Sequence, residues 1–396
     1  MNPLSCSDLP MFVRVQFVLA MVAAGAFPAA GAPRPVGAAG WHDSGFESVG
    51  LGALAETGRV EGGWEVQKIG RELLRPRLRV ECVGAVAGPK CGKQCVALAI
   101  PADTIGFEFV TVGQRVQLAT GVEYEASAWV RWPDGPNLAP VGAGPTSTHR
   151  SAIVSFWARH RDGTGDFAGR DEWLFDNQWH RLTFRFRATD PKQATLVYVS
   201  LLPNQTQAAT AVLLDEFVLR ELAHEQVEPE TRIGNLALDP DFSSQKEGAV
   251  SPPWYCASGQ AVRGEVVAGD NSTHFRLTMN RATSNFESAQ LWQHVALREG
   301  ARYEISCRIR WDKLSSEAAA PIVNFGIYHD ESRTWYGPVD QVLERIGEWR
   351  TYRFIHIPPY PGPWKLYVQL NGWGNFGRPV NVSVDDLVCA PTPAPR

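Results

Sequence analysis

Two stretches of the chain share one pattern, GVEYEASAWVRW at Gly121–Trp132 and GARYEISCRIRW at Gly300–Trp311. Each begins with a glycine, has a tyrosine three residues later and ends in tryptophan. In the second stretch, apolar residues occupy every other position from Tyr303 onward, and polar residues lie between them. A period of two is typical of a β-strand with one buried face. Both stretches therefore predict half-buried strands.

The repeat extends well beyond these two strands. Trp179 of NQWHRLTFRF matches Trp349 of GEWRTYRFIH, and Asp215 of LLDEFVL matches Asp385 of SVDDLVC. The first strands are separated by 179 residues and the later landmarks by 170, so the length difference falls in the Gly/Pro-rich stretch after Trp132. Strand patterns that are kept around a loop of variable length indicate a duplicated domain.

The repeat also sets the expected boundaries and the fold class. Short alternating segments recur at intervals of about ten residues, separated by Gly, Pro, Asn and Asp, which is typical of antiparallel sandwiches. The predicted fold class is all-β, with two consecutive antiparallel β-sandwich (jelly-roll) domains. We predict a signal segment at 1–32, a first domain at 41–222, a linker at 223–232, a second domain at 233–391 and a tail at 392–396.

The charge and the N-terminal segment favour an exported protein. Lys plus Arg number 38 and Asp plus Glu 42, so the net charge of −4 offers no electrostatic basis for binding nucleic acid. An apolar run follows Arg14 and ends near the small-residue site Ala30–Ala32, which is typical of a signal peptide starting at Met1 or at Met11. The run is too short to span a bilayer. We expect a secreted, periplasmic or cell-surface product without membrane insertion.

Six cysteines remain once the signal segment is set aside. An even number in an exported chain is compatible with disulfides, and buried free thiols are the alternative. Metal ligation is disfavoured because no CxxC pair or histidine cluster accompanies them. The six are Cys82, Cys91, Cys95, Cys256, Cys307 and Cys389.

Four motifs occur in the same order in each copy: a Phe-centred opening, a G-x-x-Y strand, a Trp-led strand and a closing strand with an acidic pair. The segments are SGFES or DPDFS, QLATGVEYEASAWVR or VALREGARYEISCRIR, NQWHRLTFRF or GEWRTYRFIH, and LLDEFVL or SVDDLVC. This order resembles the cellulase-C-type carbohydrate-binding modules of families four, nine, sixteen and twenty-two, which have a galactose-binding-like jelly roll. The resemblance covers nearly all of the chain after the signal segment.

The resemblance implies glycan binding in a groove on one sheet, where aromatic rings stack on the apolar faces of sugars. In the second copy the expected clamp is Phe286, Trp335 and Tyr336. Phe107 and Phe167 form its weaker counterpart in the first copy, and Trp373 is a secondary candidate. For each of these residues, ordinary packing in the core or a loop is the alternative interpretation.

The resemblance also implies a structural calcium ion between the first and last strands. In the first copy, Glu47 and Asp215 would supply hard oxygen ligands. In the second copy Asp385 is kept, but Ser243 replaces the opening glutamate. The alternative is that Asp215 and Asp385 accept hydrogen bonds from the backbone.

Catalysis is disfavoured by the segments of the chain that remain once both copies are assigned. The remaining segments have no room for a catalytic barrel, and Asp171 and Glu172 are neighbours on a strand, so they point to opposite faces. No G-x-S-x-G elbow and no HExxH motif occurs. We predict a non-catalytic protein that binds a polysaccharide, gains avidity from two copies, and acts beside a glycoside hydrolase in trans. The alternatives are a structural or adhesion protein with degenerate sites and, less favoured, a β-sandwich hydrolase or lyase.

Overall fold

The computed structural model confirms the predicted fold class, because it consists almost entirely of strands arranged in antiparallel sandwiches. Among the described residues, no helix is long and apolar enough to cross a membrane. The structure describes residues 34–35, 46, 52–53, 58–59, 63–69, 77–84, 87–104, 108–119, 122–143, 150–160, 168–187, 195–203, 208–222, 234–257, 262–269, 272–280, 288–312, 321–337, 341–343, 345–371 and 379–392.

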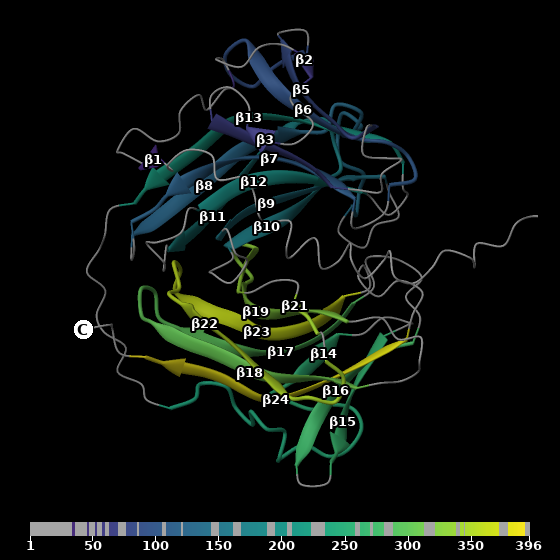
Figure 1. The fold of residues 1–396 in the computed structure, drawn as a ribbon, viewed down its shortest axis with the longest axis vertical. Helices are drawn as coiled ribbons and strands as arrows, with labels where there is room; N and C mark the ends of the chain where they lie inside the picture. The colour runs from purple at the N-terminus through teal and green to yellow at the C-terminus, as the bar shows by residue number, and fades with distance from the viewer. Residues whose placement is uncertain are drawn as a thin grey trace, which may run out of the picture.

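The first copy is the upper sandwich in Figure 1, coloured purple to teal. One of its layers has the order β11-β8-β13-β6-β5-β2, and the other includes β10-β9-β12-β7-β4-β3, with β1 beside β7. The strands are β1 (Arg34–Pro35), β2 (Gly52–Ala53), β3 (Gly58–Arg59), β4 (Trp64–Ile69), β5 (Arg79–Gly84), β6 (Gln94–Ile100), β7 (Phe109–Gln117), β8 (Glu123–Arg131), β9 (Ala152–His160), β10 (Ala168–Leu174), β11 (Trp179–Arg187), β12 (Thr195–Leu202) and β13 (Thr210–Glu221).

The second copy is the lower sandwich in Figure 1, coloured green to yellow. Its layers have the orders β15-β16-β24-β18-β22 and β14-β17-β23-β19-β20, with β21 beside β19. The strands are β14 (Tyr255–Ala257), β15 (Val262–Ala268), β16 (Thr273–Met279), β17 (Ser288–Leu297), β18 (Tyr303–Asp312), β19 (Ile322–His329), β20 (Thr334–Tyr336), β21 (Gln341–Val342), β22 (Arg350–His356), β23 (Gly362–Asn371) and β24 (Val380–Pro391).

The two repeated strands of the sequence occupy the same place in each copy. β8 lies between β11 and β13, and β18 lies between β22 and β24. In β18 the alternating residues Tyr303, Ile305, Ile309 and Trp311 are buried, as the period of two predicts. The closing strand of each copy pairs with this strand and carries a register shift beside its acidic pair.

Large aromatic residues fill equivalent positions in the two cores. In the first copy, Phe46 stacks on Trp64 with ring centroids 4.2 Å apart. In the second copy, Phe242 lies 5.2 Å from Trp254 and 5.7 Å from Phe275. All of these side chains are fully buried, so each contributes on the order of 3 kcal/mol to the stability of its sandwich. The opening Phe-centred motif is therefore a core element.

The two copies are joined through their sheets. β10 pairs antiparallel with β20, with Ala168 opposite Tyr336 and Gly169 opposite Trp335. This pairing merges one layer of each sandwich into a single thirteen-stranded sheet. The sequence predicted two domains connected by a linker, and it gave no signal for a shared sheet.

Side chains on both sides of this joint hold it together. The Tyr336 hydroxyl donates to the Arg185 carbonyl at 2.6 Å, and the Arg185 N–H donates to the Tyr360 hydroxyl at 3.1 Å. Arg333 lies 3.3 Å from Glu172 as an ion pair. The first two bonds are made by groups with little access to water, so they contribute more than the exposed ion pair.

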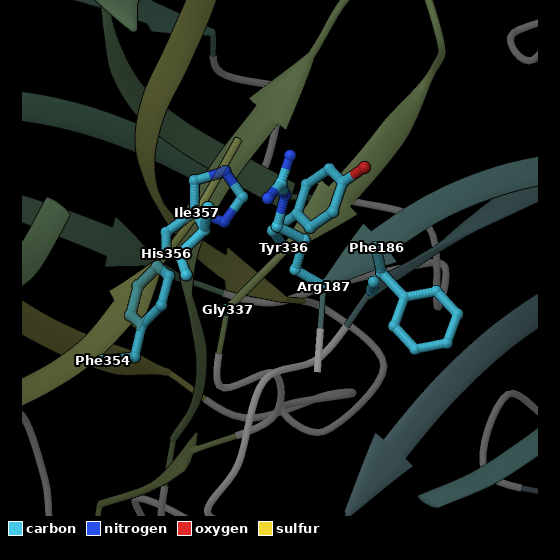
Figure 2. A pocket seen from close by; sticks show the side chains of 8 residues that line it. Phe186, Arg187, Tyr336, Gly337, Phe354, His356 and Ile357 are labelled. Carbon is cyan, nitrogen blue, oxygen red and sulfur yellow. The ribbon is translucent and has the colours of Figure 1, made fainter. Parts of the chain in front are cut away.

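A small pocket lies in the joint and is lined by both copies, with Phe186 and Arg187 on one side and Tyr336 and His356 on the other (Figure 2). Its volume is too small for a sugar ring. The pocket is therefore part of the seam between the copies.

All six cysteines are free thiols in the structure. Cys307 and Cys389 lie fully buried in the second core, and burial raises the pKa of the Cys307 thiol. A buried thiol with a raised pKa is a poor nucleophile, so Cys307 serves packing.

Candidate functional site

One face of the thirteen-stranded sheet carries a line of aromatic side chains in the second copy. Tyr255 on β14 lies opposite Trp292 on β17, which lies opposite Tyr367 on β23. On β19 and β20, Tyr328 lies opposite Trp335. Residues that face each other across antiparallel strands point to the same side of the sheet. The residues that alternate with them are buried in the core, so this line points away from the core.

The rings in this line touch one another. Tyr255 and Trp292 stack with centroids 4.5 Å apart and planes at 18°. Trp335 lies 4.1 Å from Tyr328 and 4.8 Å from Tyr367. Tyr255 is 43% exposed, and Trp292, Tyr328 and Trp335 are partly exposed. Rings fixed by their neighbours lose little entropy on binding, which suits them to contact a flat apolar ligand.

Polar side chains lie beside the rings on the same face. A row of amide side chains lies two residues along the strands from the rings. It consists of the register partners Gln290, Gln369 and Asn324. On the other side of the rings, the Lys365 ammonium lies 5.0 Å from the Trp292 ring centroid and 2.6 Å from Asp330. The carboxylate offsets the ammonium charge, so the face offers hydrogen-bonding groups without a strong net charge.

The aromatic line continues into the first copy. Trp335 is opposite Gly169 on β10, Gly169 is opposite Trp157 on β9, and Trp157 is opposite Tyr198 on β12. The Arg159 guanidinium lies 5.4 Å from the Tyr198 ring centroid. We call the complete line the aromatic row: Tyr255, Trp292, Tyr367, Tyr328, Trp335, Trp157 and Tyr198.

Glycine is required at two places in the row because neighbouring groups lie against the backbone there. A Cβ atom at Gly169 would lie 2.3 Å from the Trp157 indole, and one at Gly326 would lie 2.9 Å from the Tyr367 hydroxyl and 2.3 Å from the Tyr336 carbonyl oxygen. At such distances a side chain fits only if the neighbouring groups move. The two large side chains, Trp157 and Tyr367, therefore lie over bare backbone.

A carboxylate lies next to the row in the first copy. Asp171 accepts hydrogen bonds from the Trp157 indole N–H at 3.0 Å and from the Ser155 hydroxyl at 2.5 Å. Burial raises the pKa of the Asp171 carboxyl, and these two hydrogen bonds oppose the rise. Glu172 points to the other face and pairs with Arg170 and Arg333, as the alternation of the strand predicts.

The structure separates the two adjacent residues of the predicted clamp. Trp335 lies in the aromatic row, but Tyr336 points to the core and is 4% exposed. Its ring packs 4.8 Å from His356 and 5.3 Å from Trp364, and its hydroxyl bonds to Arg185. Neighbouring residues on a strand cannot share a face, so Tyr336 serves the joint and cannot stack on a sugar. This corrects the sequence-based expectation for Tyr336.

The other predicted contacts lie outside the described residues and stay predictions: Phe286, Phe107, Phe167, Trp373 and Glu47. Sequence reasoning missed six of the seven aromatic side chains in the row, all but Trp335, because it compared residues at matching repeat positions. The alternation along their strands places Trp157 and Tyr198 on one face, but it does not indicate which strands are neighbours in the sheet.

The two closing aspartates hold backbone amides. Asp215 accepts from the Cys91 and Glu216 N–H groups, each at 2.8 Å, and Asp385 accepts from the Asp386 N–H at 2.9 Å. These bonds agree with the alternative interpretation of the sequence, in which Asp215 and Asp385 accept hydrogen bonds from the backbone. Among the described residues, no three His, Cys, Asp or Glu side chains form a group that could hold a metal ion. With Glu47 outside those residues, the calcium ion stays a prediction.

Replacing Asp385 with asparagine should stabilise the protein at neutral pH. Burial, together with the Asp386 and Asp241 carboxylates, raises the pKa of Asp385 to about 6. The folded state then binds more protons than the unfolded state between pH 4 and 6, so stability falls as pH rises through that window. We expect Asp385→Asn to raise the free energy of unfolding by about 1–2 kcal/mol at pH 7 and by less at pH 4.

Urea unfolding at both pH values, with and without calcium, checks this expectation. In a chelator, a variant that is less stable than the wild type at pH 7 would contradict it. If Asp385 is a calcium ligand, added calcium should stabilise the wild type and leave the variant unchanged.

Among the comparisons with known proteins, only the solved structures gave matches. No family model matches the chain, and no curated protein matches it. Among solved structures, it is similar to the N-terminal tandem of two CBM22 domains from Paenibacillus barcinonensis Xyn10C. The identity is 16%, the match covers 93% of this chain and 100% of that chain, and the TM-score is 0.30.

Two further solved structures each match 40% of this chain. One is TmCBM61 in complex with β-1,4-galactotriose, with 20% identity, 40% of this chain, 99% of that chain and a TM-score of 0.28. The other is the MgGH51 α-L-arabinofuranosidase, with 12% identity, 40% of this chain, 26% of that chain and a TM-score of 0.30. These neighbours include the class of module that the sequence resembles.

Proposed function

We propose that the protein binds a polysaccharide without cleaving it, by stacking sugar rings on the aromatic row. The observation that carries the proposal is the line of touching, partly exposed rings that includes Tyr255, Trp292, Tyr328 and Trp335. A pyranose ring has an apolar face of C–H groups, and an aromatic ring covers that face at little entropic cost.

The polar groups beside the rings fit the same ligand. The amides of Gln290, Gln369 and Asn324 lie along one side of the row and can exchange hydrogen bonds with sugar hydroxyls. Lys365 is paired with Asp330, so the face favours a neutral or weakly charged polysaccharide. Glu172, the neighbour of Asp171, points to the other face, so the two cannot form the carboxylate pair typical of glycoside hydrolases.

The proposal extends to where the protein acts. The predicted signal segment favours a secreted, periplasmic or cell-surface location, where the polysaccharide is accessible. A glycoside hydrolase acting in trans would be the catalytic partner, with this protein holding the substrate.

Isothermal titration against soluble β-glucans, xylans, mannans and galactans tests the proposal, using residues 33–396, Trp335→Ala and Trp292→Ala. Each variant should bind about tenfold or more weakly, because it removes a stacking surface. The matched control is Trp349→Ala, since Trp349 is also partly exposed but packs against Arg308 and Arg310 on the other sheet.

The possible results separate the function classes. An equal loss of binding in Trp349→Ala would show that the row is not the site. No heat with any glycan would leave a structural or adhesion role. Release of reducing ends from a glycan would establish the hydrolase or lyase alternative.

A further inference from the structure

We propose that the two copies form one glycan-binding groove that crosses the β10–β20 joint, so that a single polysaccharide chain contacts both copies. This inference rests on the proposed function and replaces the expectation of two separate sites linked only by avidity. Its basis is the register of the merged sheet, which leaves no break in the aromatic row at the joint.

The register places the rings of the two copies next to each other across a single glycine. Trp335 of the second copy and Trp157 of the first are both direct partners of Gly169. The Trp157 indole lies over the Gly169 backbone, where even a methyl group would collide with it. Trp157 is 8% exposed, so a ligand that follows the row passes over its buried indole between the partly exposed rings of Trp335 and Tyr198.

The length of the row exceeds what a short sugar can cover. From β14 to β12 the sheet order has seven steps, and at about 4.8 Å between neighbouring strands the row runs for about 34 Å. A disaccharide would contact only one or two rings on this path. Tyr255, Trp292, Tyr328, Trp335 and Tyr198 are at least partly exposed along this path, whereas Tyr367 and Trp157 are 1% and 8% exposed. A longer oligosaccharide can therefore contact exposed rings on both sides of the joint.

The joint is stiff enough to keep the row in line. Arg185 of the first copy bonds through its backbone to the Tyr336 and Tyr360 hydroxyls of the second. A prearranged groove needs no ordering of the two copies when a long ligand binds, whereas two flexibly linked sites would.

The two arrangements differ in stoichiometry. In one shared groove, a single oligosaccharide binds per chain, and affinity grows with ligand length until the joint is crossed. In two separate sites, two short oligosaccharides bind per chain, and removing one site leaves the affinity of the other unchanged.

The experiment is calorimetry with the tetrasaccharide, hexasaccharide and octasaccharide of β-1,4-linked glucose, xylose and mannose. The proteins are the wild type, Tyr198→Ala for the first copy, Trp292→Ala for the second, and Trp349→Ala as the control. Circular dichroism verifies that each variant is folded.

A shared groove predicts one octasaccharide per chain in the wild type, in Tyr198→Ala and in Trp292→Ala. Each of these two variants should bind the octasaccharide about tenfold more weakly, and the gain from tetrasaccharide to octasaccharide should shrink in both.

Two outcomes would overturn the groove and leave the proposed function standing. One is two oligosaccharides per chain at every length, with each variant removing one of them. The other is unchanged octasaccharide binding in Tyr198→Ala, which would confine the site to the second copy. Absence of binding by the wild type to every glycan would instead reject the proposed function.

Discussion

The protein should lose stability steeply as the pH falls below 6.5, because His356 is buried in the joint in its neutral form. Its side chain is 4% exposed, its Nε2 atom has no hydrogen-bond partner, and its ring packs 4.8 Å from Tyr336 and 5.1 Å from Trp364. Burial lowers the pKa of His356 to about 3.

The sign of the effect follows from proton binding. An unfolded histidine has a pKa near 6.5, so between pH 6.5 and pH 3 the unfolded state carries a proton that folded His356 does not. The free energy of unfolding therefore falls with decreasing pH, by about 1.4 kcal/mol per unit and by roughly 4 kcal/mol over the whole window. Burial also lowers the pKa values of His274 and His329, which adds to the loss. Asp385 opposes it, since its raised pKa favours the folded state at lower pH.

The variant His356→Phe keeps a ring in the joint and removes the titrating group. Urea unfolding at pH 4.5 and 7.5 should show a markedly smaller loss of stability in this variant than in the wild type. His180→Gln is the matched control, because the His180 side chain is 38% exposed. A pH dependence that is the same in wild type and His356→Phe would contradict the prediction.

Gly169→Ala should weaken both the fold and the binding of long glycans. The added Cβ would lie 2.3 Å from the Trp157 indole and 2.6 Å from the Phe156 carbonyl oxygen, so β10 has to move away from β9. Overpacking of this kind costs about 1–3 kcal/mol of stability. Since β10 is also the strand that pairs with β20, the shift should disturb the joint and remove the affinity gain of the octasaccharide over the tetrasaccharide.

Chemical unfolding and titration of the same variant measure both effects. The stability cost of Gly169→Ala should be smaller in a Trp157→Ala background than in the wild type, because that background lacks the indole that the new methyl group meets, while the Phe156 carbonyl remains. Wild-type stability in Gly169→Ala would show that β10 and β9 adapt at no cost, and the close approach would then have no bearing on the row.

The sequence was sufficient for the elements of the fold. The alternation from Tyr303 to Trp311 predicted a half-buried strand, and β18 occupies Tyr303–Asp312 with its apolar residues inside. The repeat predicted that the equivalent strand β8 has the same neighbours in the first copy. The sequence predicts these features because they are local or follow from duplication. Alternation with a period of two shows which face of a strand is apolar.

The candidate site was predictable only in part. Trp335 was named from its place before a repeated tryptophan, and it lies in the aromatic row. Tyr336 was named with it, although the alternation of a strand already puts the two on opposite faces. The sequence did not indicate that Trp157, which is 178 residues before Trp335, lies one glycine away from it in the merged sheet.

The sequence by itself therefore determined the strands, their buried faces, the duplication and the absence of common catalytic motifs. Tertiary structure decided which aromatic rings meet, because the neighbours of a strand come from distant parts of the chain and their register depends on packing of the whole sandwich. Tertiary structure also decided which strands form the joint between the two copies. The pairing of β10 with β20 uses backbone N–H and C=O groups, which every strand has, so no side-chain pattern in the sequence predicts it. That pairing joins the aromatic rings of the two copies into one row.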